Sequence, residues 1–142
     1  MEIYQVSVFV ENKSGKLADI TDVLSENGIN IRALCIADTA DFGILRLIVE
    51  DPHKTEKILM DNGFTVTLTK VIGARISDTP GGLSTVLRIL SDAGIGIEYL
   101  YAFIEKTADR ASVILRVDDD VKAETVLLDK GVELIEGDAF HE

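Results

Sequence analysis

Two pairs of short segments echo each other along the chain and decide its fold. Residues 12–17 read NKSGKL and residues 24–31 read LSENGINI, whereas residues 78–83 read DTPGGL and residues 90–97 read LSDAGIGI. A shift of 66 positions aligns them, and 7 of the 21 residues from 11 to 31 are then identical to their counterparts: Gly15, Leu17, Leu24, Ser25, Gly28, Ile29 and Ile31. Self-similarity of this kind indicates an internal repeat.

The repetition continues beyond these segments with a slightly larger shift. At a shift of 68 positions, 8 of the 21 residues from 43 to 63 are identical to residues 111–131. The change of shift places a two-residue insertion near residues 106–110, where a hairpin loop absorbs it. The sequence therefore predicts two copies of one structural unit, over residues 1–69 and 70–142, joined without a Pro-, Gly- or Ser-rich linker.

Each copy predicts the same order of elements. The run from Ile3 to Val10 is β-branched and aromatic and predicts a strand, while Leu17, Ile20, Val23 and Leu24 recur at helical spacing. The first copy predicts strands 3–10, 29–37, 43–50 and 64–68 with helices 15–27 and 52–62, and the second strands 72–76, 97–105, 111–117 and 132–135 with helices 82–93 and 121–130. This order indicates an α+β fold of two ferredoxin-like βαββαβ units, each an antiparallel four-stranded sheet with two helices on one face.

The apolar pattern of the strands predicts a further contact surface. In residues 29–37 one alternation set is Ile31, Ala33 and Cys35, and the other includes Leu34 and Ile36, so both are largely apolar. A strand with one face in water shows alternation instead. We therefore expect the sheets to pack on each other or on a second chain, and we expect a homodimer.

Composition and charge exclude several classes of function. The chain has 14 Lys and Arg against 25 Asp and Glu, a net charge of −11. Such a surface repels phosphate, so neither nucleic acid nor an anionic membrane is expected as a partner. The lone cysteine and the lack of a signal segment predict a cytoplasmic protein. No catalytic, cofactor-binding or metal-ligating motif is present, so we expect no enzyme activity, cofactor or metal.

The loop before the first helix of each copy is the most informative local feature. It holds a polar residue, a glycine and a leucine, as Asn12, Gly15 and Leu17 in one copy and as Asp78, Gly81 and Leu83 in the other. The glycine lets a ligand approach the unpaired N–H groups of the helix start, which attract a carboxylate. A plain helix entry, with Pro80 in the first turn and Asp78 or Thr79 as cap, explains the spacing as well.

The repeated motif, ENKSGKL followed by GINI and SDTPGGL followed by GIGI, resembles the ACT domain. The resemblance covers the whole chain as two copies, and it is strongest to stand-alone tandem ACT proteins without a catalytic domain. ACT domains bind amino acids and regulate metabolic enzymes. The family holds its effector between two units, with the loop of one unit and the start of the second strand of its neighbour.

The resemblance implies a set of ligand-binding residues. They are Asn12, Ser14, Gly15 and Leu17 in the first loop, Asn30 at the second strand, and Asp78, Pro80, Gly81 and Leu83 in the second loop. The copies are not equivalent: the family's proline is Ser14 in the first, and the counterpart of Asn30 in the second is Gly96. Asn12 with Asn30 is the favoured pair, whereas Asp78 would repel a carboxylate and could hold an ammonium group.

Three other features have structural interpretations that we favour. Tyr99, Tyr101 and Phe103 alternate like an RNA-stacking platform, but the charge opposes RNA and favours a packed face. Cys35 is expected in the core, and the acidic run 118–120 is expected to complement a helix start rather than hold a cation.

The sequence thus predicts a regulatory protein that binds a free amino acid and acts on a partner protein in amino acid metabolism. A metabolic enzyme subunit is the expected partner, and acetolactate synthase is a candidate by family association. The alternative is an adaptor that uses the ACT fold for protein–protein contacts and binds no small molecule.

Overall fold

A computed structural model describes residues 2–11, 13–38, 42–104 and 110–137 of the chain. It divides into two compact units. The first unit comprises residues 4–69, and the second comprises residues 70–136 together with the N-terminal residues through Ile3.

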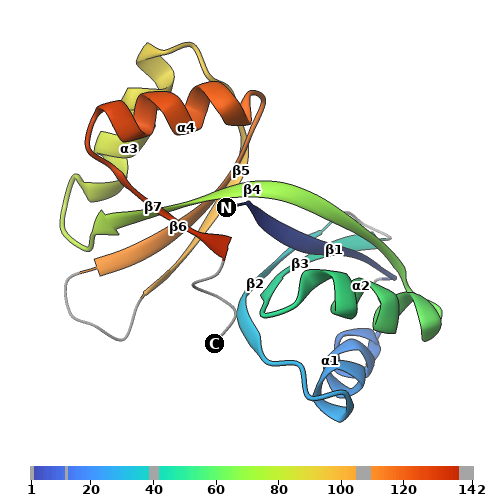
Figure 1. The fold of residues 1–142 in the computed structure, drawn as a ribbon. Coiled ribbons are helices and arrows are strands. Elements are labelled where there is room, and N and C mark those ends of the chain that lie inside the picture. The colour runs from blue at the N-terminus through green and yellow to red at the C-terminus, as the bar shows by residue number, and fades with distance from the viewer. Residues whose placement is uncertain (1, 12, 39–41, 105–109, 138–142) are drawn as a thin grey trace. The chain divides into compact units, whose positions relative to one another are not determined.

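The first unit is a sheet with two helices on one face (Figure 1). Its elements are β1 (Ile3–Glu11), α1 (Lys16–Glu26), β2 (Ile31–Asp38), β3 (Phe42–Val49), α2 (Pro52–Asp61) and the first part of β4 (Thr65–Ser77). The strands lie in the order β2-β3-β1-β4, and β3 pairs antiparallel with both β1 and β2. This is the βαββαβ arrangement predicted from the sequence.

The second unit repeats the plan with the rest of β4 as its first strand. It continues with α3 (Gly82–Asp92), β5 (Ile97–Ile104), β6 (Arg110–Val117), α4 (Asp120–Asp129) and β7 (Glu133–Ile135). Here β6 pairs antiparallel with β4 and β5, and β7 pairs with the other edge of β4. The α3 and α4 helices lie on one face of this sheet (Figure 1). The predicted α+β fold of two ferredoxin-like units is therefore confirmed.

The largest difference from the predicted elements lies at the junction of the two copies. The sequence predicted separate strands at 64–68 and 72–76, but β4 runs without a break from Thr65 to Ser77. Residues 65–72 read TVTLTKVI, which is rich in β-branched side chains and contains neither Gly nor Pro, so nothing interrupts the extended backbone.

Each unit has its own apolar core, and the two cores use equivalent positions. Leu24 on α1 and Leu59 on α2 are buried in the first, and Leu90 on α3 and Leu127 on α4 are buried in the second. The strands contribute alternate residues that face the helices, such as Val6, Val8, Val10, Leu45 and Leu47 in the first unit, and Ile72, Val113, Leu115 and Val117 in the second. Of the α1 residues at helical spacing, Ile20 and Leu24 are buried and Val23 packs against the core, as predicted, whereas Leu17 is 42% exposed.

The second helix of each unit begins with an aspartate cap. The Asp51 carboxylate accepts from Lys54 N at 3.1 Å, and Pro52 occupies the first turn of α2. The Asp119 carboxylate accepts from Lys122 N at 3.1 Å at the start of α4. These caps satisfy N–H groups that a helix start leaves without an intrahelical partner.

The apolar surface of β2 is only partly covered within its unit. Leu34 and Ile36 pair across the strands with Leu47 and Leu45, on the face that carries the helices. They nevertheless remain 56% and 44% exposed, because β2 is the edge strand of the sheet. Burial of both alternation sets, which the sequence predicted, would need a surface beyond this unit. Among the described residues, no helix is long and apolar enough to cross a membrane.

Candidate functional site

The first helix of each unit begins at a glycine with a left-handed backbone. Gly15 precedes α1 with φ 88°, and Gly81 precedes α3 with φ 90°. This conformation favours glycine over every residue that has a Cβ. A glycine also has no side chain with which to cap the helix, in contrast to Asp51 and Asp119 at the other two helix starts. At the starts of α1 and α3, therefore, no cap side chain accepts a hydrogen bond from the first backbone N–H groups of the helix. These donors can bind another partner.

The space beside both glycines is open. A Cβ built on Gly15 or on Gly81 would have no heavy atom within 4 Å, apart from the adjoining residues. An external group can therefore approach the backbone at these positions.

The described loop residues of the predicted site lie at these two starts. Ser14 and Gly15 are exposed in the first loop, and Asp78, Pro80 and Gly81 are exposed in the second. Asn12 lies outside the described residues. The two leucines differ, because Leu83 packs against the core of its unit whereas Leu17 is 42% exposed.

A small hollow lies beside the first loop. Its volume is about 70 Å³, and Leu17, Ile36, Lys13 and Lys16 are among the residues that line it. Lys13 also forms an ion pair with Glu11, at 3.2 Å between Nζ and Oε2. Apolar and cationic groups thus meet at the start of α1.

The second loop is closed more tightly on itself. Ser77 Oγ and Thr79 Oγ1 are 2.8 Å apart and share a hydrogen bond. A Cβ on Gly82 would stand only 2.0 Å from the carbonyl oxygen of Ser77, so this position requires glycine. The first copy has Lys16 at the equivalent position, and its side chain fits there. The backbone therefore follows a different path into α1 than into α3.

Asn30 lies far from the loop of its own unit. It precedes β2, whereas Gly15 follows β1, which runs parallel to β2. The eight residues of β2 extend over roughly 25 Å, which separates the two ends of the sheet. Asn30 and the first loop are therefore not brought together within one unit.

Gly96, which stands in the second copy where the first has Asn30, has a local structural role. Its N–H donates to both carboxylate oxygens of Asp118, each at 3.1 Å. A Cβ at this position would stand 2.8 Å from Asp118 Oδ2. Gly96 therefore anchors the start of β5 to the end of β6 and has no side chain to offer a ligand.

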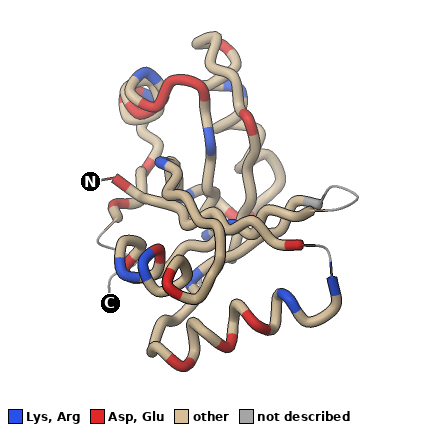
Figure 2. The backbone as a smooth tube through the Cα atoms, turned by 90° about the vertical axis from the view of Figure 1, so that its right-hand side faces the viewer, with Lys and Arg blue, Asp and Glu red and all other residues tan. Residues whose placement is uncertain are grey.

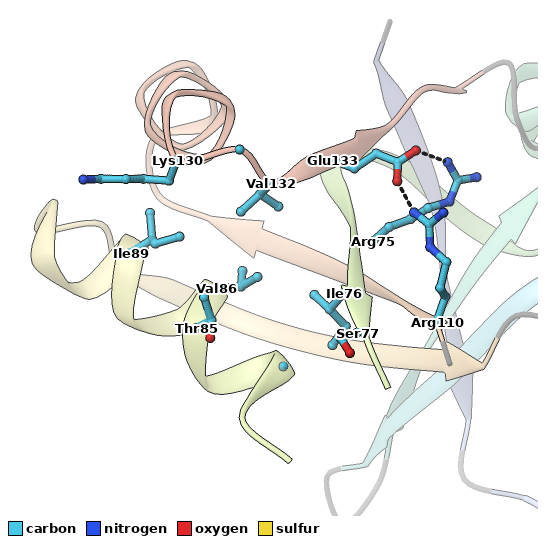
Figure 3. A pocket seen from close by; sticks show the side chains of 12 residues that line it. Arg75, Ile76, Ser77, Thr85, Val86, Ile89, Arg110, Lys130, Val132 and Glu133 are labelled. Carbon is cyan, nitrogen blue, oxygen red and sulfur yellow. Dashed lines mark hydrogen bonds and ion pairs between the residues drawn. The ribbon is translucent and has the colours of Figure 1, made fainter. Parts of the chain in front are cut away.

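The structure reveals a larger feature that the sequence prediction missed. A groove of about 520 Å³ lies in the second unit between α3, the end of β4 and the start of β7. Figure 3 shows Ile76, Val86, Ile89 and Val132 pointing toward one another as its apolar wall. We refer to it as the β7 groove.

An ion-pair cluster closes one end of the β7 groove. Arg75 donates to one oxygen of Glu133 at 3.0 Å, and Arg110 donates to the other (Figure 3). The hydrogen bond from Arg110 has the largest effect on Glu133 and the one from Arg75 the second largest, and both lower the pKa of its carboxyl group. The signal in the sequence was the difference between the repeats, because Phe9 and Phe42 occupy the positions of Arg75 and Arg110 in the first copy.

Another ion pair lies near the junction of the two copies. Lys70 Nζ is 3.1 Å from Glu2 Oε1. The hydrogen bond to Glu2 raises the pKa of Lys70 above its ordinary value.

Of the remaining sequence features, Cys35 differs from the expectation of a core position, whereas the aromatic residues of β5 and the acidic run agree with theirs. Tyr99, Tyr101 and Phe103 lie on one face of β5 and are half-buried. Cys35 is half-buried, with Sγ 4.0 Å from Arg46 Nη1 rather than in the core. In the acidic run, Asp119 caps α4 as predicted. Among the described residues, no group of three or more His, Cys, Asp or Glu side chains could hold a metal ion.

Comparison with known proteins decides the family. A family model described as an ACT domain pair matches residues 1–142. The chain belongs to this family. The predicted resemblance to tandem ACT proteins is therefore confirmed, and it accounts for two glycine-started helices at equivalent positions.

Solved structures with this ACT pair fold are similar over nearly the full chain. Protein BT0572 from Bacteroides thetaiotaomicron is 44% identical, with 100% of this chain and 97% of that chain covered and a TM-score of 0.94. The regulatory subunit of aspartate kinase from Thermus thermophilus is 16% identical, with 90% of each chain covered and a TM-score of 0.67. The second likeness shows the fold alone. No curated protein matches the sequence.

Proposed function

We propose that this ACT domain pair is a cytoplasmic, non-catalytic regulatory protein that binds a free amino acid between ACT units. Binding favours one arrangement of the units by its differential affinity, and the partner protein responds to that arrangement. The observation that carries the proposal is the pair of glycine-started helices, α1 and α3, beside open space.

The first loop suits the α-carboxylate of an amino acid. The backbone N–H groups and the dipole at the start of α1 attract an anion. Lys13 and Lys16 stand at this same end, although cations near a helix start disfavour the helix. Residues that oppose helix stability, such as these two lysines, are typical of functional sites.

The second loop suits the other end of the same ligand. Asp78 is exposed at the start of this loop and carries the opposite charge to the lysines of the first. A carboxylate there attracts an ammonium group. Acidic residues outnumber basic ones, with a net charge of −11, and Figure 2 shows Lys and Arg in blue interspersed with Asp and Glu in red along the backbone.

We propose that the site is completed by a neighbouring unit in a homodimer. Asn30 lies at the opposite end of β2 from the loop of its own unit, so it can reach an effector only in a neighbouring unit. The edge strand β2 exposes Leu34 and Ile36, which a second chain would cover. Burial of apolar side chains is the main driving force of such association.

The partner we propose is an enzyme of amino acid metabolism. One structure with a similar fold is the regulatory subunit of aspartate kinase from Thermus thermophilus. A second similar structure is that of aspartokinase alpha and beta subunits, with 16% identity and a TM-score of 0.56. Enzymes of this class, including aspartate kinase and acetolactate synthase, are the partners to test first.

A thermal-shift screen over the twenty amino acids tests the proposal. A ligand at 100 times its dissociation constant stabilises the folded state by about 2.7 kcal/mol, which raises the midpoint by several degrees. We expect one amino acid, or a chemically related group, to do so. Twenty unchanged midpoints at millimolar concentration would contradict the proposal.

Paired glycine variants locate the effect. Gly15→Ala and Gly63→Ala both place a Cβ at positive φ (88° and 86°) in open space, so both strain the backbone similarly. Only Gly15 lies at the proposed site. We expect Gly15→Ala to abolish the amino acid effect and Gly63→Ala to keep it. Asn12→Ala and Asp78→Ala should each weaken binding.

A second function, as an adaptor without a small-molecule ligand, is favoured by the exposed apolar side chains of the first unit. Phe9 and Phe42 are 52% and 51% exposed, in addition to Leu34 and Ile36. Phe9 alternates with the core residues Val8 and Val10, so it lies on the sheet face opposite Leu34 and Ile36, and the first unit exposes apolar side chains on both faces. Large exposed apolar side chains are typical of protein contacts. Twenty flat thermal-shift traces, together with loss of dimerisation in Leu34→Ser, would favour the adaptor.

A further inference from the structure

The β7 groove has the size and composition of a small-molecule site. Its volume of about 520 Å³ lies within the range of ligand pockets, which are mostly apolar with a few placed polar groups. Ile76, Val86, Ile89 and Val132 form its apolar wall, and Arg75 and Arg110 stand at one end (Figure 3). The groove adjoins the second loop, because Ser77 and Gly82 line it, but the predicted ligand-binding residues Asp78, Pro80 and Gly81 do not.

The repeat supplies an internal comparison for this groove. At the position of Val132 the first copy has Phe64, which packs against the core of its unit. At the positions of the two arginines it has Phe9 and Phe42. The cross-strand pairing confirms this equivalence, because Phe42 pairs with Glu11 and Arg110 pairs with Ser77 at the same places in the two sheets.

The charge of the groove opposes that of the chain. Arg75, Arg110 and Lys130 contribute three positive charges to its lining and Glu133 one negative charge, whereas the whole chain carries −11. Glu133 is shared between both guanidinium groups, one on each oxygen. The arginine end therefore has an excess of one positive charge and forks of N–H donors that match a carboxylate.

We propose that the β7 groove binds a small carboxylate with an apolar body. The apolar body lies along the wall formed by α3 and Val132, and the carboxylate lies at Arg75 and Arg110, where it competes with Glu133. This gives the second unit a ligand site that the first unit lacks the residues to form.

The experiment compares four probes of the folded, full-length chain by amide NMR. Hexanoate has both parts of the proposed ligand, acetate only the carboxylate, hexan-1-ol only the apolar body, and hexylammonium the opposite charge. We expect hexanoate to shift the signals of Val86, Ile89 and Val132 with a dissociation constant of about 1 mM or lower. The other three should bind at least about tenfold more weakly.

Three variants test the roles of the residues. Val132→Phe introduces the first-copy side chain and should weaken hexanoate binding, because the larger ring occupies part of the apolar wall. Arg110→Gln should weaken it about tenfold, because one charge-assisted hydrogen bond is lost. Glu133→Gln should strengthen it severalfold, because the internal competitor loses its charge. The amide spectrum of each variant establishes that it is folded.

The outcomes separate this proposal from the proposed function. Asp78→Ala should leave hexanoate binding unchanged, and Val132→Phe should leave the thermal response to an amino acid unchanged. Equal binding of hexylammonium and hexanoate, or weaker binding in Glu133→Gln, would overturn the carboxylate assignment. Wild-type affinity in a folded Val132→Phe would overturn the location.

Discussion

The two units share one backbone plan but differ in what surrounds it. Equivalent leucines fill both cores, equivalent aspartates cap α2 and α4, and equivalent glycines begin α1 and α3. Three residues that line the β7 groove, which we call the rim positions, differ from their counterparts in the first unit. Arg75, Arg110 and Val132 of the second unit correspond to Phe9, Phe42 and Phe64 of the first. Core and cap positions therefore specify the fold, while the rim positions are available for different ligands or partners.

The largest expected effects test whether the cores are equivalent. Leu24→Ala and Leu90→Ala remove equivalent side chains that are 1% and 0% exposed. Each should lower the free energy of unfolding by about 2–5 kcal/mol, since a buried leucine leaves a cavity. Urea unfolding of both variants measures this. A difference of more than about 2 kcal/mol between them would show that the two cores do not contribute alike.

A smaller effect is expected where the two loops diverge. Gly82→Ala must displace the Ser77 carbonyl, which would lie 2.0 Å from the new Cβ, and should cost about 1–3 kcal/mol. Lys16→Ala at the equivalent position of the first copy should change stability by less than about 0.5 kcal/mol. Thermal unfolding compares the two. Equal losses would contradict the tighter closure of the second loop.

Removing either helix cap should lower the free energy of unfolding by a similar amount, which is smaller than the losses above. Asp51→Ala and Asp119→Ala each remove one carboxylate that accepts a backbone N–H at the start of a helix. Each should cost about 1 kcal/mol, the usual contribution of such a cap. Denaturant midpoints provide the measurement, and Asp129→Ala, at the exposed end of α4, serves as the control. A cap variant as stable as this control would rule out the capping role.

The smallest expected effect is a pH dependence confined to the second unit. The pKa of Glu133 is lowered from its ordinary 4.5 by Arg110 and Arg75, so its ion pairs stabilise the fold above that pH. This stabilisation is lost as the pH falls through the lowered pKa of the folded state. Because the side chain is 50% exposed, the stability difference between wild type and Glu133→Gln should stay below about 1 kcal/mol near neutral pH.

Unfolding measured between pH 7 and pH 2 checks this expectation. The difference between wild type and Glu133→Gln should shrink toward zero at the acid end. Thr65→Val, at the equivalent position of the first unit, should give a difference from wild type that does not vary with pH. A Glu133→Gln difference that grows on acidification would have the wrong sign for a lowered pKa.

The sequence predicted the fold well because the relevant signals are local. Leucines at helical spacing, glycines after helices and Asp51-Pro52 before a helix each specify a nearby backbone conformation. The two-strand prediction around 69–71 was wrong because no local signal distinguishes a junction from a continuous strand there.

The candidate site was less predictable from the sequence. The loop glycines were found because they need only a local backbone conformation. The β7 groove was missed because its lining comes from α3, β4, β6 and the chain after α4, and no single segment contains its pattern. The bond between Gly96 and Asp118 joins residues 22 positions apart, so the lack of a side chain at Gly96 had no explanation in the local sequence.

The most direct test of the central claim follows the amide signals of Gly15 and Gly81 during titration with each of the twenty amino acids. Gly63 and Gly94, which also have positive φ but follow helices, are the internal reference. One amino acid should shift the Gly15 and Gly81 signals saturably and leave the reference pair in place. If none of the twenty shifts either loop glycine, or if all four glycines shift alike, the amino acid site at these helix starts is contradicted.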